Sequence, residues 1–164
     1  MVHGMTTTKI KMLDVSLPER SLENIRSILE ANSMPPRIPE ATMYNCWGFT
    51  AYYFGWEENA KWLPSYKMEE HLKSNTVPVH LTEVRAGDIA VFRFGRHLEH
   101  TAIVMPNTSV VCHKPGGGLL CIETMQGAQD KYGKEITYVR NAEKNSTPSL
   151  DNSLTCASIW VTKE

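Results

Sequence analysis

From Val84 onward the chain is a series of short apolar runs separated by turn residues, and this pattern limits the choice of fold more than any other. Each run has the length and the β-branched content of a strand, and glycine, proline and asparagine stand between the runs. Turns as short as Pro106-Asn107 join neighbouring strands antiparallel. We therefore predict strands after the turn at 86–88 and within residues 100–105, 109–113, 119–125, 136–140 and 154–161.

Helices are expected before the strands. Apolar residues recur at helical spacing after Ser16 and Pro18, and an aromatic-rich stretch of helical length begins at Cys46. We predict helices within residues 19–33, 46–56 and 66–73, and loops at 34–40 and 141–152. Helices followed by antiparallel strands predict an α+β fold, in which the sheet packs on the helix that begins at Cys46.

Length and charge exclude several classes of protein. The 164 residues suit one domain, which we place at 16–164 after a flexible segment 1–15. With 17 basic and 18 acidic residues the net charge is −1, so no nucleic-acid partner is expected. The apolar runs are too short to span a membrane. The N-terminus lacks the apolar core of a signal peptide, so a cytoplasmic location is the default expectation.

One of the four cysteines stands in a context that favours reactivity. Cys46 begins a predicted helix, whereas the other three lie in strand-like runs and are expected to be buried free thiols, at positions 112, 121 and 156. The positive end of a helix dipole lowers the pKa of a thiol, and unpaired backbone N–H groups there can hold an oxyanion. The side chain of Tyr44 or Asn45 could add a donor. Gly48 allows a close approach by another segment or by a substrate.

Two histidines are candidates for the base that a cysteine nucleophile needs. His100 opens one predicted strand and His113 ends the next, so an antiparallel pair would bring both to the same end of the hairpin. His113 could then orient His100. Glu123, on the following strand, is a competing third member. We expect no metal site, because no carboxylate or second cysteine stands at ligand spacing.

Three segments together resemble the NlpC family of cysteine peptidases in their order and spacing. They are NCWGF at 45–49, AGDIAVFR at 86–93 and HTAIVMPNTSVVCHKPGGGLLCIETM at 100–125. The resemblance implies a papain-like fold with Cys46 as nucleophile, His100 as general base and His113 as the residue that orients His100. It also implies hydrolysis of an amide bond in peptidoglycan stem or cross-bridge peptides, without a cofactor.

The chain departs from the family pattern at two positions, and a related family offers another reading. Trp47 stands where the family has a small residue, which would reshape the substrate groove. Met34 stands where a tyrosine often assists the oxyanion hole, so that role is vacant or passes to Tyr44. The CHAP amidases share the order of cysteine and histidine, and there Glu123 would be the third member.

Other functions remain open on the sequence. A peptidoglycan enzyme without a signal peptide would be a phage product or an effector delivered by a secretion system, and an effector would imply an immunity or inhibitor protein as partner. The alternative enzyme is an intracellular peptidase, isopeptidase or thioesterase acting on a protein or acyl conjugate. The alternative without catalysis is an inactive papain-like binding module.

Overall fold

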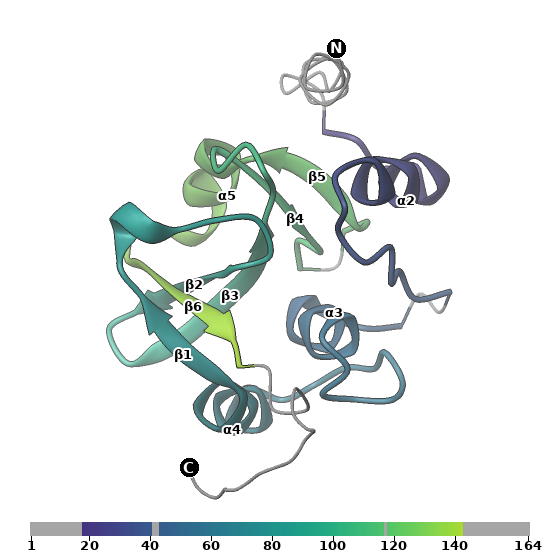
Figure 1. The fold of residues 1–164 in the computed structure, drawn as a ribbon. Helices are drawn as coiled ribbons and strands as arrows, with labels where there is room; N and C mark the ends of the chain where they lie inside the picture. Colours follow the sequence, from purple (N-terminus) through teal and green to yellow (C-terminus); the bar gives the residue numbers. More distant parts are fainter. Residues whose placement is uncertain (1–17, 41–42, 117, 143–164) are drawn as a thin grey trace, which may run out of the picture.

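A six-stranded antiparallel sheet forms the centre of the molecule, in the strand order β1-β6-β2-β3-β4-β5 (Figure 1). The computed structural model describes residues 18–40, 43–116 and 118–142. The strands are β1 (Thr76–Val79), β2 (Ile89–Phe94), β3 (His97–Val104), β4 (Val110–His113), β5 (Cys121–Thr124) and β6 (Ile136–Asn141). The helices are α2 (Leu22–Ala31), α3 (Cys46–Tyr53), α4 (Ser65–Asn75) and α5 (Met125–Tyr132), with a 3₁₀ turn at Leu81–Glu83.

The predicted α+β architecture is confirmed, with two differences in its elements. Residues 119–125 were expected to be one strand, but that prediction is wrong at its end. The strand stops at Thr124, whose side chain accepts the backbone N–H of Gly127 and so caps α5. Strand β1 was not predicted, and its Pro78 is tolerated because β1 lies at the edge of the sheet. The flexible segment 1–15 and the strand at 154–161 lie outside the described residues.

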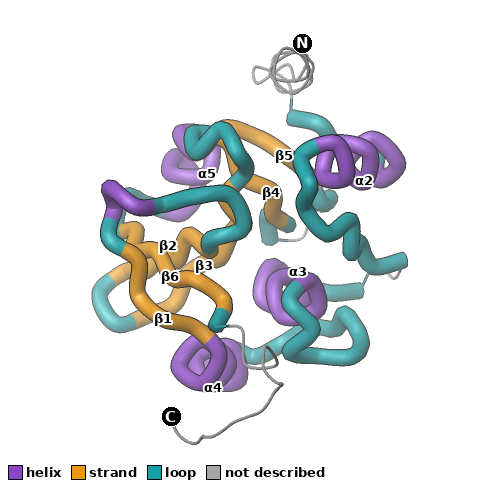
Figure 2. The backbone as a smooth tube through the Cα atoms, in the orientation of Figure 1, coloured by secondary structure: helices purple, strands orange, loops and turns teal. Residues whose placement is uncertain are grey.

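Helix α3 is largely buried, which matches its apolar sequence, and it runs between α2 and α4 beside the sheet (Figure 2). On one flank Phe49 and Tyr53 join Ile25 and Leu29 of α2 in a buried cluster that reaches the sheet. On the other flank Ala51 joins a second cluster with residues of α4 and β2. The sheet and two helices therefore hold α3, and with it Cys46, in a defined position.

The start of α3 is clamped by the segment that precedes α4. The side chain of Asn45 caps the helix by accepting the N–H of Gly48, and it also exchanges two hydrogen bonds with the backbone of Leu63. A Cβ atom at Gly48 would lie 1.8 Å from the carbonyl oxygen of Lys61. The close approach expected at Gly48 is thus made by the chain itself.

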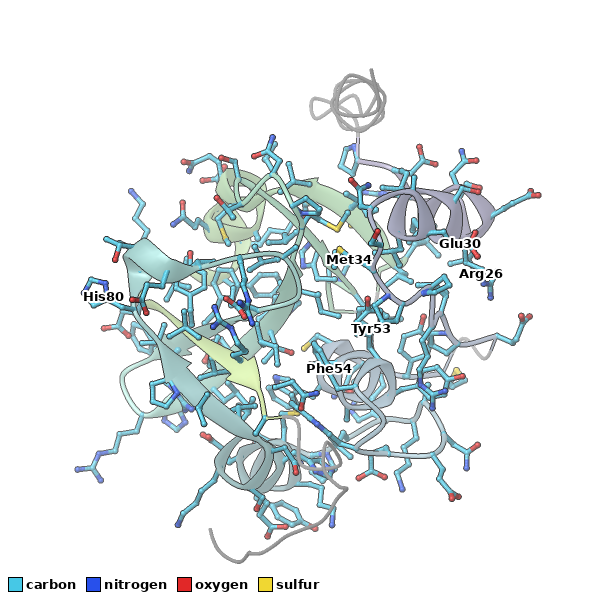
Figure 3. All side chains as sticks on the ribbon, in the orientation of Figure 1. Arg26, Glu30, Met34, Tyr53, Phe54 and His80 are labelled. Atoms are coloured by element: carbon cyan, nitrogen blue, oxygen red, sulfur yellow. The ribbon has the colours of Figure 1, made fainter. Side chains whose placement is uncertain are left out.

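The Gly87-Asp88 pair before β2 has a structural role and lies near the end of α3 opposite Cys46. Asp88 is buried and accepts hydrogen bonds from the Arg140 side chain and from the backbone of Arg85, so it ties β2 to β6. With Met34, Tyr53 and Phe54 (Figure 3), these residues line a cavity of about 390 Å³; the full lining is Asn32, Ser33, Met34, Pro35, Tyr53, Phe54, Arg85, Ala86, Gly87, Asp88, Arg140 and Asn141. The cavity lies at the end of α3 opposite Cys46 and contains none of the predicted catalytic residues.

None of the described helices combines the length and the apolar character needed to cross a membrane.

Candidate active site

Cys46 is the first residue of α3, as predicted, and its thiol lies against β3. The backbone N–H groups of Thr101, which follows His100, of Trp47 and of Cys46 itself lie close enough to the sulfur to lower the pKa of the thiol. A buried hydrogen bond of 2.8 Å between the hydroxyls of Thr50 and Thr101 fixes α3 on β3 one turn further along. These contacts place the nucleophile beside the strand that carries His100.

The expected low pKa of Cys46 is wrong. Burial raises the pKa of the thiol to about 12, because a thiolate loses its hydration at this position. The three backbone N–H groups and the nearby Lys114 ammonium lower the pKa, but burial outweighs them. The helix dipole is therefore not enough, and the thiol needs a base to take its proton.

A chain of three buried side chains begins at His100, the residue before Thr101 on β3. His100 Nε2 lies 2.6 Å from His113 Nδ1, and His113 Nε2 lies 2.5 Å from Glu123 Oε2. His100 and His113 are fully buried and Glu123 is 5% exposed. The predicted proximity of the two histidines is confirmed, since β3 and β4 pair antiparallel. The sequence left His113 and Glu123 as alternative third members. In the structure His113 bonds both His100 and Glu123, so the three side chains form one chain.

The chain determines which nitrogen of each ring carries a hydrogen. The pKa of Glu123 is lowered to about 2, chiefly by its hydrogen bond with His113, so Glu123 is an ionised acceptor. His113 therefore donates from Nε2 and accepts at Nδ1, and His100 must donate from Nε2. This leaves His100 Nδ1 as a bare lone pair. That atom is buried and has no hydrogen-bond partner among the described residues, as a base waiting for the thiol proton would.

Both histidines are held in the neutral form. Burial lowers the pKa of His100 well below 6.5, and the charges of His113 and Lys131 act in the same direction. Burial also lowers the pKa of His113, although the Glu123 carboxylate opposes this. Lys131 donates to Glu123 at 3.0 Å and so completes the pairing of the carboxylate. The site at rest is a neutral thiol beside a neutral imidazole.

Tyr132, at the end of α5, is a site residue that the sequence did not indicate. Its ring stacks on His100 with the ring centroids 3.7 Å apart and the planes at 5°. Its phenol oxygen faces the backbone of Gly116, which lowers the pKa of Tyr132, but burial outweighs this and raises that pKa to about 12. Tyr132 therefore covers one face of the base and fixes the orientation of its ring. The Thr124 cap could have revealed α5, but not what α5 packs against.

The structure brings together one group of possible metal ligands that their spacing in the sequence did not indicate. His113, Cys121 and Glu123 are buried with their donor atoms within 4.8 Å of one another, so a cysteine and a carboxylate do gather at a histidine. Both ring nitrogens of His113 already have hydrogen-bond partners, and the Lys131 ammonium lies at the same carboxylate oxygen. This donor set fits a proton-linked chain better than a cation.

The three residues expected to shape the oxyanion hole or the cleft lie around Cys46. Asn45 is buried, and its amide uses both oxygen lone pairs and one N–H for the cap and for Leu63. Tyr44 is buried, with its ring 5.1 Å from the Lys114 ammonium. The Trp47 side chain packs on the cluster shared by α3 and α4. Their roles toward a substrate stay predictions.

The comparison with protein-family models agrees with this geometry. Residues 36–140 match the NlpC/P60 family, and this range contains Cys46, His100, His113 and Glu123. No curated protein matches the chain significantly. The matched range covers more than half of the chain and nearly all of the described fold, so the protein belongs to the NlpC/P60 family of papain-like cysteine peptidases, whose members typically act on cell-wall peptidoglycan.

Proposed function

We propose that the protein hydrolyses an amide bond in peptidoglycan stem or cross-bridge peptides, with Cys46 as nucleophile, His100 as general base, and His113 and Glu123 as the groups that orient the base. The observation that carries this proposal is the hydrogen-bonded chain from Glu123 to His100, which leaves His100 Nδ1 unpaired beside the strand that binds the thiol. Membership of the NlpC/P60 family supports the substrate class.

In the first half of the reaction His100 Nδ1 takes the thiol proton while the sulfur of Cys46 attacks the amide carbon. The carbonyl oxygen becomes an oxyanion, and the backbone N–H groups of Cys46 and Trp47 are the donors at the helix start that can hold it. The C–N bond then breaks, and His100 gives its proton to the leaving amine.

In the second half a water molecule hydrolyses the thioester, again with His100 as base, and the carboxylic acid leaves. The positive charge that appears on His100 in both halves is stabilised by the ionised Glu123, to which His100 is linked through the hydrogen bonds of His113. Because burial disfavours that charge, the carboxylate at the end of the chain offsets part of the cost of each proton transfer.

The proposal is tested by incubating the full-length protein, beside Cys46→Ala, with peptidoglycan fragments of several wall types and reading the products by mass spectrometry. We expect a new cut in a stem or cross-bridge peptide that is absent with Cys46→Ala. No cut in any wall, with Cys46 still alkylated ahead of the other cysteines, would instead favour a protein or acyl conjugate inside the cell as substrate. Absence of both cutting and selective alkylation would favour an inactive binding module.

The route to the wall is a separate part of the proposal. We infer that a phage or a secretion system brings the enzyme to the peptidoglycan, and that an effector of this kind has an immunity or inhibitor protein. Fractionation of cells that carry the native gene tests this. A protein that stays in the cytoplasm under all conditions would contradict delivery and leave the cysteine chemistry unaffected.

The acid limb of the pH profile is expected well below pH 6.5. His100 must be neutral to accept the thiol proton, and its lowered pKa keeps it neutral at a pH where an ordinary histidine is protonated. Activity is therefore lost only as the pH falls through the lowered pKa. The measurement is kcat/KM against pH, with His71→Gln as the control, since His71 pairs with Glu57 away from the site. An acid limb at or above pH 6.5 would contradict the neutral site.

Glu123→Gln is expected to lower kcat by about 10- to 100-fold with little change in KM. The amide keeps the shape of the side chain but loses the charge that stabilises protonated His100 through His113. Steady-state kinetics on the same peptide measures this. Glu135→Gln is the matched control, because the Glu135 side chain accepts the backbone N–H of Gly95 at an exposed turn and belongs to none of the hydrogen bonds of the described site. An unchanged kcat would remove Glu123 from the catalytic chain.

A further inference from the structure

Lys114 is a buried cation that lacks a carboxylate partner. It directly follows His113, and 6% of its surface is exposed. Two other cations that are at least partly buried have carboxylate partners, since Lys131 pairs with Glu123 and Arg93 with Glu69. Within residues 18–40, 43–116 and 118–142, no carboxylate oxygen lies within ion-pairing distance of Lys114. Burial lowers the pKa of Lys114, so an anion that joined the ammonium would stabilise its charged form.

The surroundings of Lys114 belong to the active site. Its ammonium lies 5.1 Å from the centre of the Tyr44 ring, two residues before Cys46 in the chain. Burial lowers the pKa of Lys114 and raises the pKa of Cys46, and the electrostatic interaction between the two side chains opposes both shifts. The free cation is therefore within electrostatic reach of the nucleophile.

Cys46 does not supply a negative charge that balances the Lys114 ammonium in the resting enzyme. With a pKa raised to about 12, Cys46 is a neutral thiol at rest. The ring of Tyr44 contributes a weak attraction for the cation but no charge. The place beside Lys114 is thus suited to an anion that arrives with a ligand. We propose that Lys114 binds a carboxylate of the substrate beside the amide that Cys46 attacks.

This inference rests on the proposed function and narrows its substrate class. The preferred substrate carries a free carboxylate within about one residue of the scissile amide, close enough for the Lys114 side chain to reach it. A peptide in which that carboxylate is amidated would lose an ion pair with a partly desolvated ammonium. Lys114 acts here on the substrate and leaves the proton transfer to His100.

Two small alkylating agents test the subsite without any peptide substrate. Iodoacetate and iodoacetamide have nearly the same shape, but only iodoacetate carries a carboxylate; with both, sulfur forms a bond to carbon and iodide leaves. The rate of each reagent at Cys46 is measured by mass spectrometry in the full-length protein at pH 8. In Lys114→Met we expect the ratio of the iodoacetate rate to the iodoacetamide rate to fall about tenfold, and in Lys114→Arg to stay near its original value.

The controls separate this subsite from other effects. Lys73→Met removes an exposed cation at the end of α4 and should leave the ratio unchanged. Thermal unfolding of each variant shows whether it is folded. If Lys114→Met slows both reagents equally, Lys114 acts on the thiol alone and the subsite is wrong; an unchanged ratio overturns it as well. If the ratio of the iodoacetate rate to the iodoacetamide rate falls in Lys114→Met but the protein cuts no peptidoglycan, the carboxylate subsite is supported and only the peptidoglycan substrate is rejected.

Discussion

His100→Ala lowers kcat/KM by about 10⁴-fold and leaves the fold intact. Because burial keeps the Cys46 thiol protonated, the reaction depends on a base more strongly than it would with a preformed thiolate. His100 Nδ1 is a buried nitrogen without a hydrogen-bond partner among the described residues, and its lone pair can accept the thiol proton. The measurement is steady-state kinetics on the peptide found in the peptidoglycan digest, with circular dichroism to verify folding.

Two variants show whether this loss is specific to the base. His113→Ala should retain weak activity, because it removes the orienting hydrogen bond and leaves the base in place. His80→Ala changes an exposed histidine whose ring bonds the nearby Thr82, and it should be fully active. A His100→Ala enzyme with more than about a hundredth of the original kcat/KM would assign the proton transfer to another group.

Gly48→Ala destabilises the protein by about 3 kcal/mol, the upper part of the range for forcing an extra carbon into a packed site. The added Cβ would meet the carbonyl oxygen of Lys61 at 1.8 Å, and this oxygen belongs to backbone that cannot rotate away. The segment must move, which also strains the bonds between Asn45 and Leu63. The free energy of unfolding, from denaturant titration, measures the effect.

Gly55→Ala is the matched control for this substitution. Gly55 lies two residues after the end of α3 at a φ of 77°, and a Cβ atom there has open space around it. Its cost is backbone strain of about 1 kcal/mol. If Gly48→Ala cost no more than Gly55→Ala, the close crossing of the 61–63 segment over α3 would be wrong.

The contact between His100 and His113 could be predicted because it depends on local rules. Strand spacing is read from apolar runs, and a short turn leaves one way for two neighbouring strands to pair. Two histidines placed at the start of one strand and the end of the next then have to meet. The same reasoning placed Cys46 at a helix start, where Asn45 supplies the cap.

The rest of the site depends on contacts between elements that the sequence does not connect. Tyr132 lies on His100 only because α5 folds back over the sheet after β5. Glu123 reaches His113 through the β4–β5 register, in which His113 pairs with Cys121. The sequence offered His113 and Glu123 as alternatives for the third member of the site, whereas the structure places both in one hydrogen-bonded chain.

The protonation and pairing of the charged side chains were the properties of the site that the sequence predicted least well. Position at a helix start predicted a reactive thiolate at Cys46, yet burial among α3 and β3 raises the pKa instead. The sequence did not indicate a role for Lys114. Its burial, and the absence of a carboxylate beside it among the described residues, depend on which segments pack around it. The sequence by itself determined the helices and strands other than β1 and α5, their order, and the two histidines that meet, because these follow from periodicity, turns and caps. Only the tertiary structure decided the protonation states, the order of the relay and the uncovered cation, because desolvation and pairing depend on which distant groups are packed together.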